Sequence, residues 1–249
     1  MSSRSQTRRL EGKVAIVTGA GRGIGRALAL ALAAEGAAIG ALSRTRAELQ
    51  SLAAQIEQAD GRALGLVTDV TDAAAVKRSV DQVAQEFGGL DLVIANAGVS
   101  PSPASLLESD PRAFQDTLNV NLFGVYATLR GAVPHLKQRG RGNVVIVGSG
   151  MGRKAAPDSA AYLSSKAAVW MLTRVLAEEL RGSDILVDEL IPGPVDTSIS
   201  QPGLSRILQS NPNEWLKQAE DVVPLALFLA TLPPKGPTGQ SFSLARREL

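Results

Sequence analysis

The sequence predicts an α/β protein, a single domain on a doubly wound parallel sheet of about seven strands with helices on both faces. Short apolar runs that indicate buried strands alternate along the chain with stretches of helical length and periodicity. Strands separated by helices favour a parallel sheet with right-handed crossovers. The length of 249 residues, without an internal linker or low-complexity segment, fits one large domain.

The first unit is a strand, a glycine-rich turn and a helix. The apolar run at 13–17 leads into Gly19, Gly23 and Gly25, and an Ala/Leu-rich helical segment at 26–35 stops at Gly36. Glycines let a ligand approach the backbone, and a helix N-terminus offers unpaired N–H groups to a phosphate. The spacing differs from Gly-x-Gly-x-x-Gly. With a strand before it and a helix after it, the turn still predicts a nucleotide site.

The second strand, at 37–42, ends at Ser43 and Arg44. Dinucleotide-binding folds place an acidic residue in this region to bind a ribose 2′-hydroxyl. A carboxylate would repel a 2′-phosphate, whereas a guanidinium pairs with it, and Arg22 in the glycine turn supplies a second cation. The sequence therefore predicts NADP(H) in preference to NAD(H). The alternative is that Arg44 and Arg46 are solvated at the start of a helix.

The alternation continues to the end of the chain. Further strands are expected at 63–67, 90–94, 144–147, 184–190 and 238–244, and further helices at 47–58, 72–87, 111–137, around Tyr162 and at 221–232. Two segments depart from it. Residues 1–9 are Ser/Arg-rich and predict a flexible tail, which leaves 10–249 as the domain. Residues 198–215, rich in proline and polar side chains, predict a mobile lid over the substrate.

Composition excludes several classes of function. The sequence pI is about 9.1, but three of the 26 basic residues lie in the tail, so the remaining 23 nearly balance 24 acidic ones and nucleic acid is not an expected partner. No apolar run reaches the roughly 18–20 residues of a membrane span, and no secretory signal begins the chain. Without cysteine and with His135 as the single histidine, no metal site is expected. We expect a cytoplasmic protein with a small-molecule substrate.

Residues 149–166 carry the side chains best suited to chemistry. Tyr162 and Lys166 are four apart in a helical segment and so share a face. A nearby cation favours the phenolate and lowers the pKa of a tyrosine toward the working range. Ser149 follows the apolar strand at 144–147, at the carboxyl edge where open α/β sheets bind ligands. By itself the pair is more typical of a half-buried aromatic beside a solvated lysine.

Several motifs in order make the assignment specific. They are 18–25 (TGAGRGIG), Asn96-Ala97-Gly98, Asn121 in NVNL, Ser149, Tyr162 with Lys166, and 192–197 (PGPVDT). Together they resemble the short-chain dehydrogenase/reductase family, in its 3-oxoacyl-thioester reductase-like branch, from about residue 10 to residue 240. The resemblance implies a Rossmann fold and a homotetramer or homodimer.

The resemblance also implies a role for each motif. Ser149 polarises the substrate carbonyl, Tyr162 donates or accepts the proton, and Lys166 lowers the tyrosine pKa and holds the nicotinamide ribose. Asn121 completes the catalytic set by supporting a water that links Lys166 to solvent. The implied cofactor-binding residues are Gly19, Arg22, Gly23, Ile24, Gly25, Ser43, Arg44, Thr45, Asp69, Val70, Asn96, Ala97, Gly98, Tyr162, Lys166, Pro192, Gly193, Val195 and Thr197.

Three positions depart from the family pattern. Ala95 replaces an asparagine, Asp188 stands where many relatives have asparagine, and the C-terminus lacks the usual Asp-Gly-Gly. The expected function is an NADP(H)-dependent oxidoreductase acting on a ketone or secondary alcohol. A 3-oxoacyl-thioester reductase is the narrower alternative, and a catalytically silent NADP-binding sensor is the alternative of another class. The intact set of Asn121, Ser149, Tyr162 and Lys166 favours an enzyme.

Overall fold

The computed structural model describes residues 8–197, 199, 208 and 213–246. Its centre is a parallel sheet in the order β3-β2-β1-β4-β5-β6-β7. The strands are β1 (Val14–Thr18), β2 (Ala38–Ser43), β3 (Arg62–Val67), β4 (Leu92–Ala95), β5 (Arg141–Val147), β6 (Asp184–Ile191) and β7 (Ser241–Ser243). The order reverses between β1 and β4, which places a ligand crevice outside their carboxyl ends. The predicted doubly wound parallel sheet of about seven strands is confirmed.

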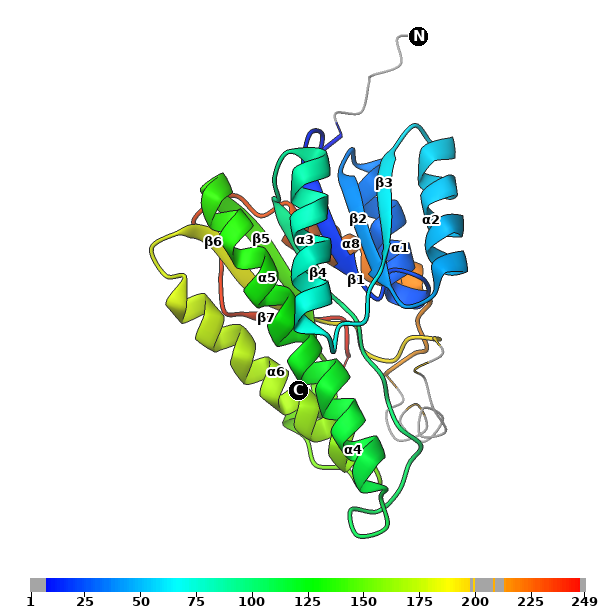
Figure 1. The fold of residues 1–249 in the computed structure, drawn as a ribbon. Helices are drawn as coiled ribbons and strands as arrows, with labels where there is room; N and C mark the ends of the chain where they lie inside the picture. The colour runs from blue at the N-terminus through cyan, green and yellow to red at the C-terminus, as the bar shows by residue number, and fades with distance from the viewer. Residues whose placement is uncertain (1–7, 198, 200–207, 209–212, 247–249) are drawn as a thin grey trace.

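Helices cover both faces of the sheet (Figure 1). One face carries α1 (Gly23–Ala34), α2 (Arg46–Gln58) and α8 (Val223–Ala230). The other carries α3 (Ala73–Phe87), α5 (Gly124–Arg139) and α6 (Ala160–Glu179), and α4 (Pro111–Leu118) packs against α6. Among the described helices, none is long and apolar enough to cross a bilayer.

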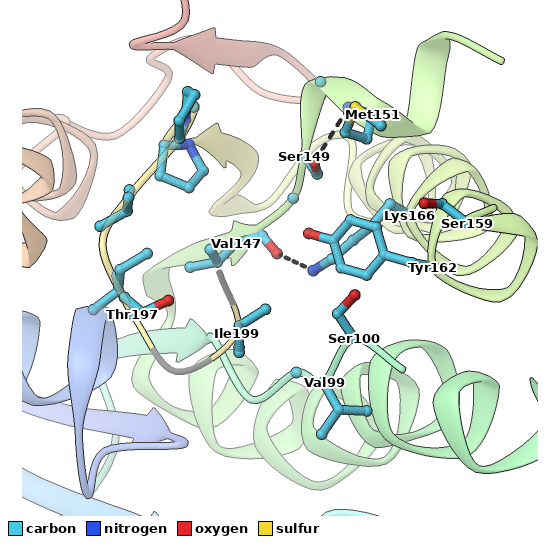
Figure 2. A pocket seen from close by; sticks show the side chains of 18 of the residues that line it. Val99, Ser100, Val147, Ser149, Met151, Ser159, Tyr162, Lys166, Thr197 and Ile199 are labelled. Carbon is cyan, nitrogen blue, oxygen red and sulfur yellow. Dashed lines mark hydrogen bonds between the residues drawn. The ribbon is translucent and has the colours of Figure 1, made fainter. Parts of the chain in front are cut away.

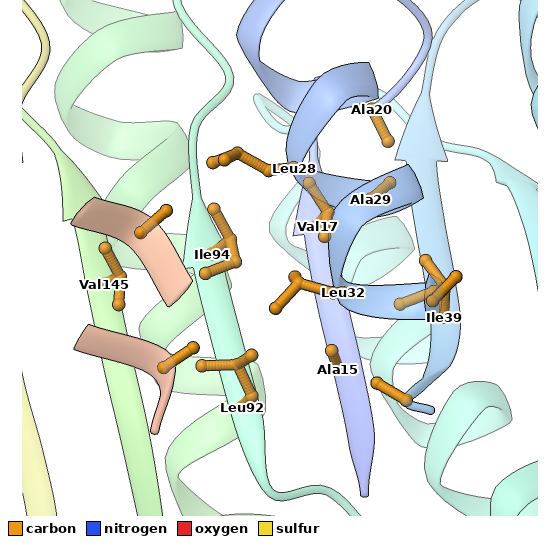
Figure 3. Close-up of a cluster of buried hydrophobic side chains, with 14 of the residues drawn as sticks. Ala15, Val17, Ala20, Leu28, Ala29, Leu32, Ile39, Leu92, Ile94 and Val145 are labelled. Atoms are coloured by element: carbon orange, nitrogen blue, oxygen red, sulfur yellow. The ribbon is translucent and has the colours of Figure 1, made fainter. Parts of the chain in front are cut away.

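The central strands β1, β2, β4, β5 and β6 are buried on both faces, which explains their continuous apolar runs, whereas the edge strands β3 and β7 are partly exposed. Ala15 and Val17 of β1 face α1, whereas Val14 and Ile16 face α3 and α5. Figure 3 shows the first cluster, in which α1 lays its leucines against β1 and β4. Leu28 and Leu32 are each 1% exposed, and full burial of such a side chain contributes about 1.5–3 kcal/mol.

Helix boundaries follow local signals. Asp72 caps α3 by accepting a hydrogen bond from the Ala75 N–H (2.9 Å), and Gly88, with φ of 79°, ends it in the left-handed conformation. The helix predicted at 111–137 is divided into α4, a π-helical turn η1 (Asn119–Phe123) and α5. The one predicted at 221–232 is a 3₁₀ turn, η3 (Ala219–Val222), followed by α8. Residues 1–7 of the predicted tail and most of the predicted lid at 198–215 lie outside the described residues.

Candidate active site

One continuous cleft runs along the carboxyl edge of the sheet. It consists of two adjoining cavities, which we name the Arg44 arm and the Tyr162 arm after the side chains at their ends. Both arms are lined by Ile24, Asn96, Gly98, Val99, Thr197 and Ile199. The loops that follow β1 to β6 supply most of the lining, because parallel strands end at the same edge. Of the predicted cofactor-binding residues, only Gly25 does not line the cleft.

The glycine turn is shaped by close packing. Gly19 has φ of 66°, and a Cβ there would lie 2.9 Å from Asn96 Nδ2. A Cβ on Gly25 would lie 2.3 Å from the Gly19 carbonyl oxygen, so Gly25 packs the helix onto the turn rather than lining the cleft. Arg22 is the N-cap of α1, and its side chain does not cap the helix. The first turn of α1 therefore offers backbone N–H groups to an anion in the Arg44 arm.

A hydroxyl joins the glycine turn to the neighbouring loop. The Thr18 hydroxyl at the end of β1 accepts hydrogen bonds from the backbone N–H groups of Asn96 (3.0 Å) and Ala97 (3.1 Å). The Asn96 amide in turn donates to the Thr18 carbonyl (2.9 Å). These bonds hold β1 and β4 together at the switch point of the sheet. Ala95, the residue that departs from the family motif, is simply buried core.

The Arg44 arm brings charged side chains of both signs together. Besides the shared Asn96 and Thr197, its polar lining comprises Arg22, Ser43, Arg44, Thr45, Glu48, Thr68 and Asp69. Burial tends to raise the pKa of Asp69, but hydrogen bonds from the Thr71 N–H (2.9 Å) and hydroxyl (2.8 Å) outweigh it, and the Arg44 guanidinium adds to them. The pKa of Asp69 is therefore lowered, and Arg44 lies close enough to this carboxylate to contribute.

Glu48 is a residue of this arm that the sequence reasoning missed. A Cβ on Gly21 would lie 2.3 Å from Glu48 Oε2 and 3.0 Å from Ser43 Oγ, so the carboxylate lies above the glycine turn and near Ser43. The sequence argument considered only Ser43 and Arg44 at the end of the second strand, and Glu48 lies further along the chain, in the next helix. The sequence did offer one signal for Glu48: it stands in the first turn of α2, where the helix dipole stabilises a negative charge, and so near the loop that lines the cleft.

The Tyr162 arm gathers the predicted reactive side chains. Figure 2 shows Ser149, Tyr162 and Lys166 around the same space. Tyr162 and Lys166 come from the first turns of α6, and Ser149 follows β5 and begins the 3₁₀ turn η2 (Gly150–Arg153). The Ser149 hydroxyl accepts a hydrogen bond from the Met151 N–H (3.2 Å). Lys166 Nζ donates to the Val147 carbonyl (2.9 Å) and lies 5.8 Å from the centre of the Tyr162 ring.

The pKa values of this pair differ from the sequence expectation. Burial raises the pKa of Tyr162, and the interaction with the Ser149 hydroxyl offsets only part of the increase. The expected lowering by Lys166 is not found; its ammonium donates to the Val147 carbonyl and lies 5.8 Å from the centre of the ring. Burial lowers the pKa of Lys166 to about 8, and the charge of Glu189 opposes this lowering.

Asn121 lies behind the cleft and does not line it. The π-helical turn η1 directs its side chain to Val99, where Oδ1 accepts from the backbone N–H (2.8 Å) and Nδ2 donates to the carbonyl (2.9 Å). Nδ2 also donates to the Ser165 hydroxyl (3.0 Å) on α6. A Cβ on Gly98 would lie 3.4 Å from Asn121 Oδ1 and 4.0 Å from Lys166 Nζ. These hydrogen bonds tie the loop after β4 to α6.

The walls of the Tyr162 arm are mainly apolar. They comprise Val99, Ser100, Pro101, Pro103, Met151, Ser159, Ile199, Ala245 and residues of the 192–195 loop. Lys166 is the charged residue among the described lining residues. Ala245 comes from the atypical C-terminal segment, which the sequence reasoning did not connect with the cleft. Among the described residues, no three His, Cys, Asp or Glu side chains gather where they could hold a metal ion.

Comparisons with known proteins agree with this geometry. The family model described as short chain dehydrogenase matches residues 13–206. A protein of Thermotoga maritima named 3-oxoacyl-[acyl-carrier-protein] reductase FabG is 34% identical over 240 residues, which cover 93% of this chain and 96% of that protein.

Two solved structures are similar over almost the whole chain. A short chain dehydrogenase from Burkholderia cenocepacia J2315 in complex with NADP has a TM-score of 0.89 and 32% identity, over 95% of this chain and 98% of that one. Carveol dehydrogenase from Mycobacterium avium in complex with NAD has a TM-score of 0.87 and 31% identity, over 95% and 97% of the two chains. The similar structures therefore include complexes with both nicotinamide cofactors.

Proposed function

We propose that this chain, which belongs to the short-chain dehydrogenase family, is an NADP(H)-dependent oxidoreductase that transfers hydride between the nicotinamide and a ketone or secondary alcohol. The observation that carries the proposal is the single cleft with Arg44 at one end and Ser149, Tyr162 and Lys166 at the other. A dinucleotide has a phosphate-bearing end and a reactive end, and the cleft offers a matching group to each.

The cleft residues fit such a cofactor. Gly19 and Gly23 both have positive φ, and without side chains they leave the turn open to a close approach by the cofactor. The N-terminus of α1 has no side-chain cap, so its free N–H groups suit the pyrophosphate. Asp69 and Val70 would bound the adenine, and the 192–197 loop would bound the nicotinamide. When bound, the nicotinamide supplies or accepts the hydride.

The NADP(H) preference rests on charge in the Arg44 arm. Arg44 and Arg22 would pair with a 2′-phosphate, whereas Glu48 would repel it. Glu48 is only partly buried on a flexible side chain, so it can turn toward solvent when an anion enters. The second carboxylate of the arm, Asp69, accepts its hydrogen bonds from Thr71 and would lie at the adenine. At the 2′-phosphate two cations therefore face one movable carboxylate, and we propose NADP(H) as the preferred cofactor.

The proton chemistry follows from the groups around Tyr162. The raised pKa keeps its phenol protonated at neutral pH, which is the form that can give a proton to a carbonyl oxygen during reduction. Ser149 would donate a hydrogen bond to the same oxygen and so stabilise the charge that develops there. Lys166, with a pKa of about 8, is mostly charged at neutral pH and adds a positive field at this end of the cleft.

The walls of the Tyr162 arm favour an uncharged ketone with an apolar body. Val99, Met151 and Ile199 offer apolar contact, and the hydroxyls of Ser100 and Ser159 offer neutral polar contacts. Lys166 would be occupied beside Tyr162 and so is not available to bind a remote carboxylate. A 3-oxoacyl thioester is the second candidate, supported by the Thermotoga maritima relative.

Exposed apolar side chains on α5 and α6 support a homo-oligomer. Tyr126 on α5 is 39% exposed, and Met171 and Val175 on α6 are 50% and 44% exposed. Phe123, at the end of η1, forms an aromatic pair with Tyr126. Helices with a second apolar face need a second partner, so we propose a homotetramer or homodimer that packs through them.

The test is NADPH consumption with a panel of ketones. The panel contains a neutral cyclic ketone, a β-keto ester, a 3-oxoacyl thioester and a keto acid. We expect the neutral ketones to react and the keto acid to be slow. Tyr162→Phe should lower kcat by about 10²- to 10⁴-fold, because the transferable proton is lost, while the Kd for NADPH stays close to wild type. No turnover with any ketone, or a Tyr162→Phe variant of wild-type rate, would overturn the proposal.

A further inference from the structure

A carboxylate is buried directly behind the reactive site. Glu189 lies on β6 with 0% exposure, between the buried apolar residues Val187 and Ile191 that face the same side. A charge in such a place destabilises the fold unless it is paired and hydrogen-bonded. Glu189 Oε2 accepts hydrogen bonds from Arg153 Nη2 (2.7 Å) and from the Ser241 hydroxyl (2.5 Å).

The backbone beside this carboxylate connects it to the reactive groups. A Cβ on Gly148 would lie only 1.8 Å from Glu189 Oε1, so the carboxylate occupies the space that a side chain at position 148 would need. Gly148 lies between Val147, whose carbonyl accepts the bond from Lys166 Nζ, and Ser149. Glu189 therefore lies against the peptide segment that holds both reactive side chains.

Cations surround the carboxylate on the helix side. Lys166, Trp170 and Arg174 follow one another at four-residue spacing on α6 and so share a face. The guanidinium groups of Arg153 and Arg174 lie 5.5 and 4.5 Å from the centre of the Trp170 ring. Arg174 Nη2 also donates to the Ser241 hydroxyl (3.4 Å).

Glu189 is the one acid that these groups share within the part of the chain that the structure describes. The charge that acts on the Lys166 ammonium is the Glu189 carboxylate on β6, and the Tyr162 ring centre on α6 lies 5.8 Å from it. The guanidinium groups of Arg153 on η2 and Arg174 on α6 interact with the same carboxylate. Glu189 Oε2 is paired with Arg153 (2.7 Å), whereas Oε1 has no hydrogen-bond partner among the described residues.

We infer that Glu189 is a positioning residue for Lys166, whose buried ammonium it keeps charged while it fixes the Ser149 turn through Arg153. The inference rests on the proposed function of the Tyr162 arm. The pKa directions agree with it, because burial lowers the pKa of Lys166 and Glu189 opposes that effect. Removal of the negative charge should let Lys166 lose its proton at lower pH.

The experiment compares three variants of the full chain. Glu189→Gln removes the charge at nearly constant volume, and Arg153→Met removes the cation that competes for the carboxylate. Asp188→Asn is the matched control, because it removes a buried charge one residue away whose side chain faces the opposite side of the sheet. The readouts are the pH profile of kcat/KM and the NMR titration of ¹³Cε-labelled lysine, with the Lys166 signal assigned from Lys166→Met.

Opposite shifts are expected from the two test variants. In Glu189→Gln, the Lys166 titration and the alkaline limb of kcat/KM should both move to lower pH, with about a 10-fold loss at alkaline pH for each pH unit moved. Arg153→Met should move them to higher pH, and Asp188→Asn should leave them in place. A purely structural role would not produce shifts of opposite sign.

Each outcome decides the inference. A folded Glu189→Gln variant with an unchanged Lys166 titration would overturn it. If Glu189→Gln does not fold, Arg153→Met decides alone, and a shift to lower pH or no shift would overturn it. The NMR titration does not require turnover, so a protein that reduces no ketone would refute the proposed function and still leave the Glu189 inference open to this test.

Discussion

Asp188 provides a prediction of stability with a definite pH dependence. This side chain on β6 is 2% exposed, and its Oδ1 accepts a hydrogen bond from the Gln240 N–H (2.9 Å). Burial raises its pKa from the ordinary 3.8 to about 6, although the bond from Gln240 acts in the other direction. The folded protein therefore binds this proton more strongly than the unfolded chain does.

The sign and size follow from linkage. Because the folded-state pKa lies above the unfolded one, the contribution of Asp188 to stability falls as pH rises from about 3.8 to about 6 and stays low above that range. A shift of about two units corresponds to a penalty on the order of 3 kcal/mol at pH 7. Asparagine keeps an acceptor for the Gln240 N–H and has no charge to bury. Asp188→Asn should therefore stabilise the protein at neutral pH.

The assay is thermal unfolding of both proteins between pH 4.5 and pH 8. At pH 7 the variant should unfold at a Tm about 5–10 °C higher, since 1 kcal/mol shifts Tm by roughly 2–4 °C in a chain of this size. The advantage should shrink toward pH 4.5, where the aspartate is largely protonated in the folded state. A constant advantage at every pH, or none at pH 7, would refute the reasoning. In the first case packing rather than charge would be responsible.

Three further predictions concern the cofactor and assembly. The double variant Ser43→Asp with Arg44→Ser should prefer NADH over NADPH, as measured by the ratio of their kcat/KM values. A charge-assisted Arg–phosphate contact gives about a 10- to 100-fold preference, and because Arg44 is exposed we expect the lower end of this range. An unchanged ratio would mean that Arg44 does not contact the phosphate. Glu48→Gln should raise the preference for NADPH by about 5-fold, as expected for removal of about 1 kcal/mol of repulsion in a solvated cleft, and a reduced preference would contradict its place near the 2′ position. Sedimentation at micromolar concentration should show an oligomer, and a single 26.0 kDa species would refute association through α5 and α6.

The sequence was sufficient for the parts of the molecule that depend on local pattern. Buried parallel strands give continuous apolar runs. The turn at Gly19 requires glycine, because its backbone has positive φ and leaves no room for a Cβ. These signals placed the sheet, its order of layers and the cleft at its carboxyl edge. They also placed Ser149, Tyr162 and Lys166 in one cavity, since Tyr162 and Lys166 share a helix face and Ser149 ends the neighbouring strand.

Contacts between distant segments were beyond the sequence. In the sequence, Glu189 is a charged residue within a largely apolar strand. The structure shows that the absent side chain of Gly148 leaves space for it, and that Arg153 and Ser241 donate hydrogen bonds to it. The pKa of Tyr162 likewise depends on burial in the folded cleft, which outweighs the cation that the spacing placed nearby. Such effects are set by three-dimensional packing and have no period or motif.

Because of the π-helical turn at Asn119–Phe123, the packing of the segment 111–139 depends on its exact number of residues. Helix α4 packs against α6 and α5 packs against α3, so the two halves of one helical stretch are packed against different helices. A π turn accommodates one extra residue relative to a regular α-helix, and each residue of an α-helix turns the next by about 100°. Deletion of one residue here would leave a smooth helix whose halves no longer face both partners. Homologous chains would be expected to tolerate exchanges of side chain in this turn far better than a change in the number of residues.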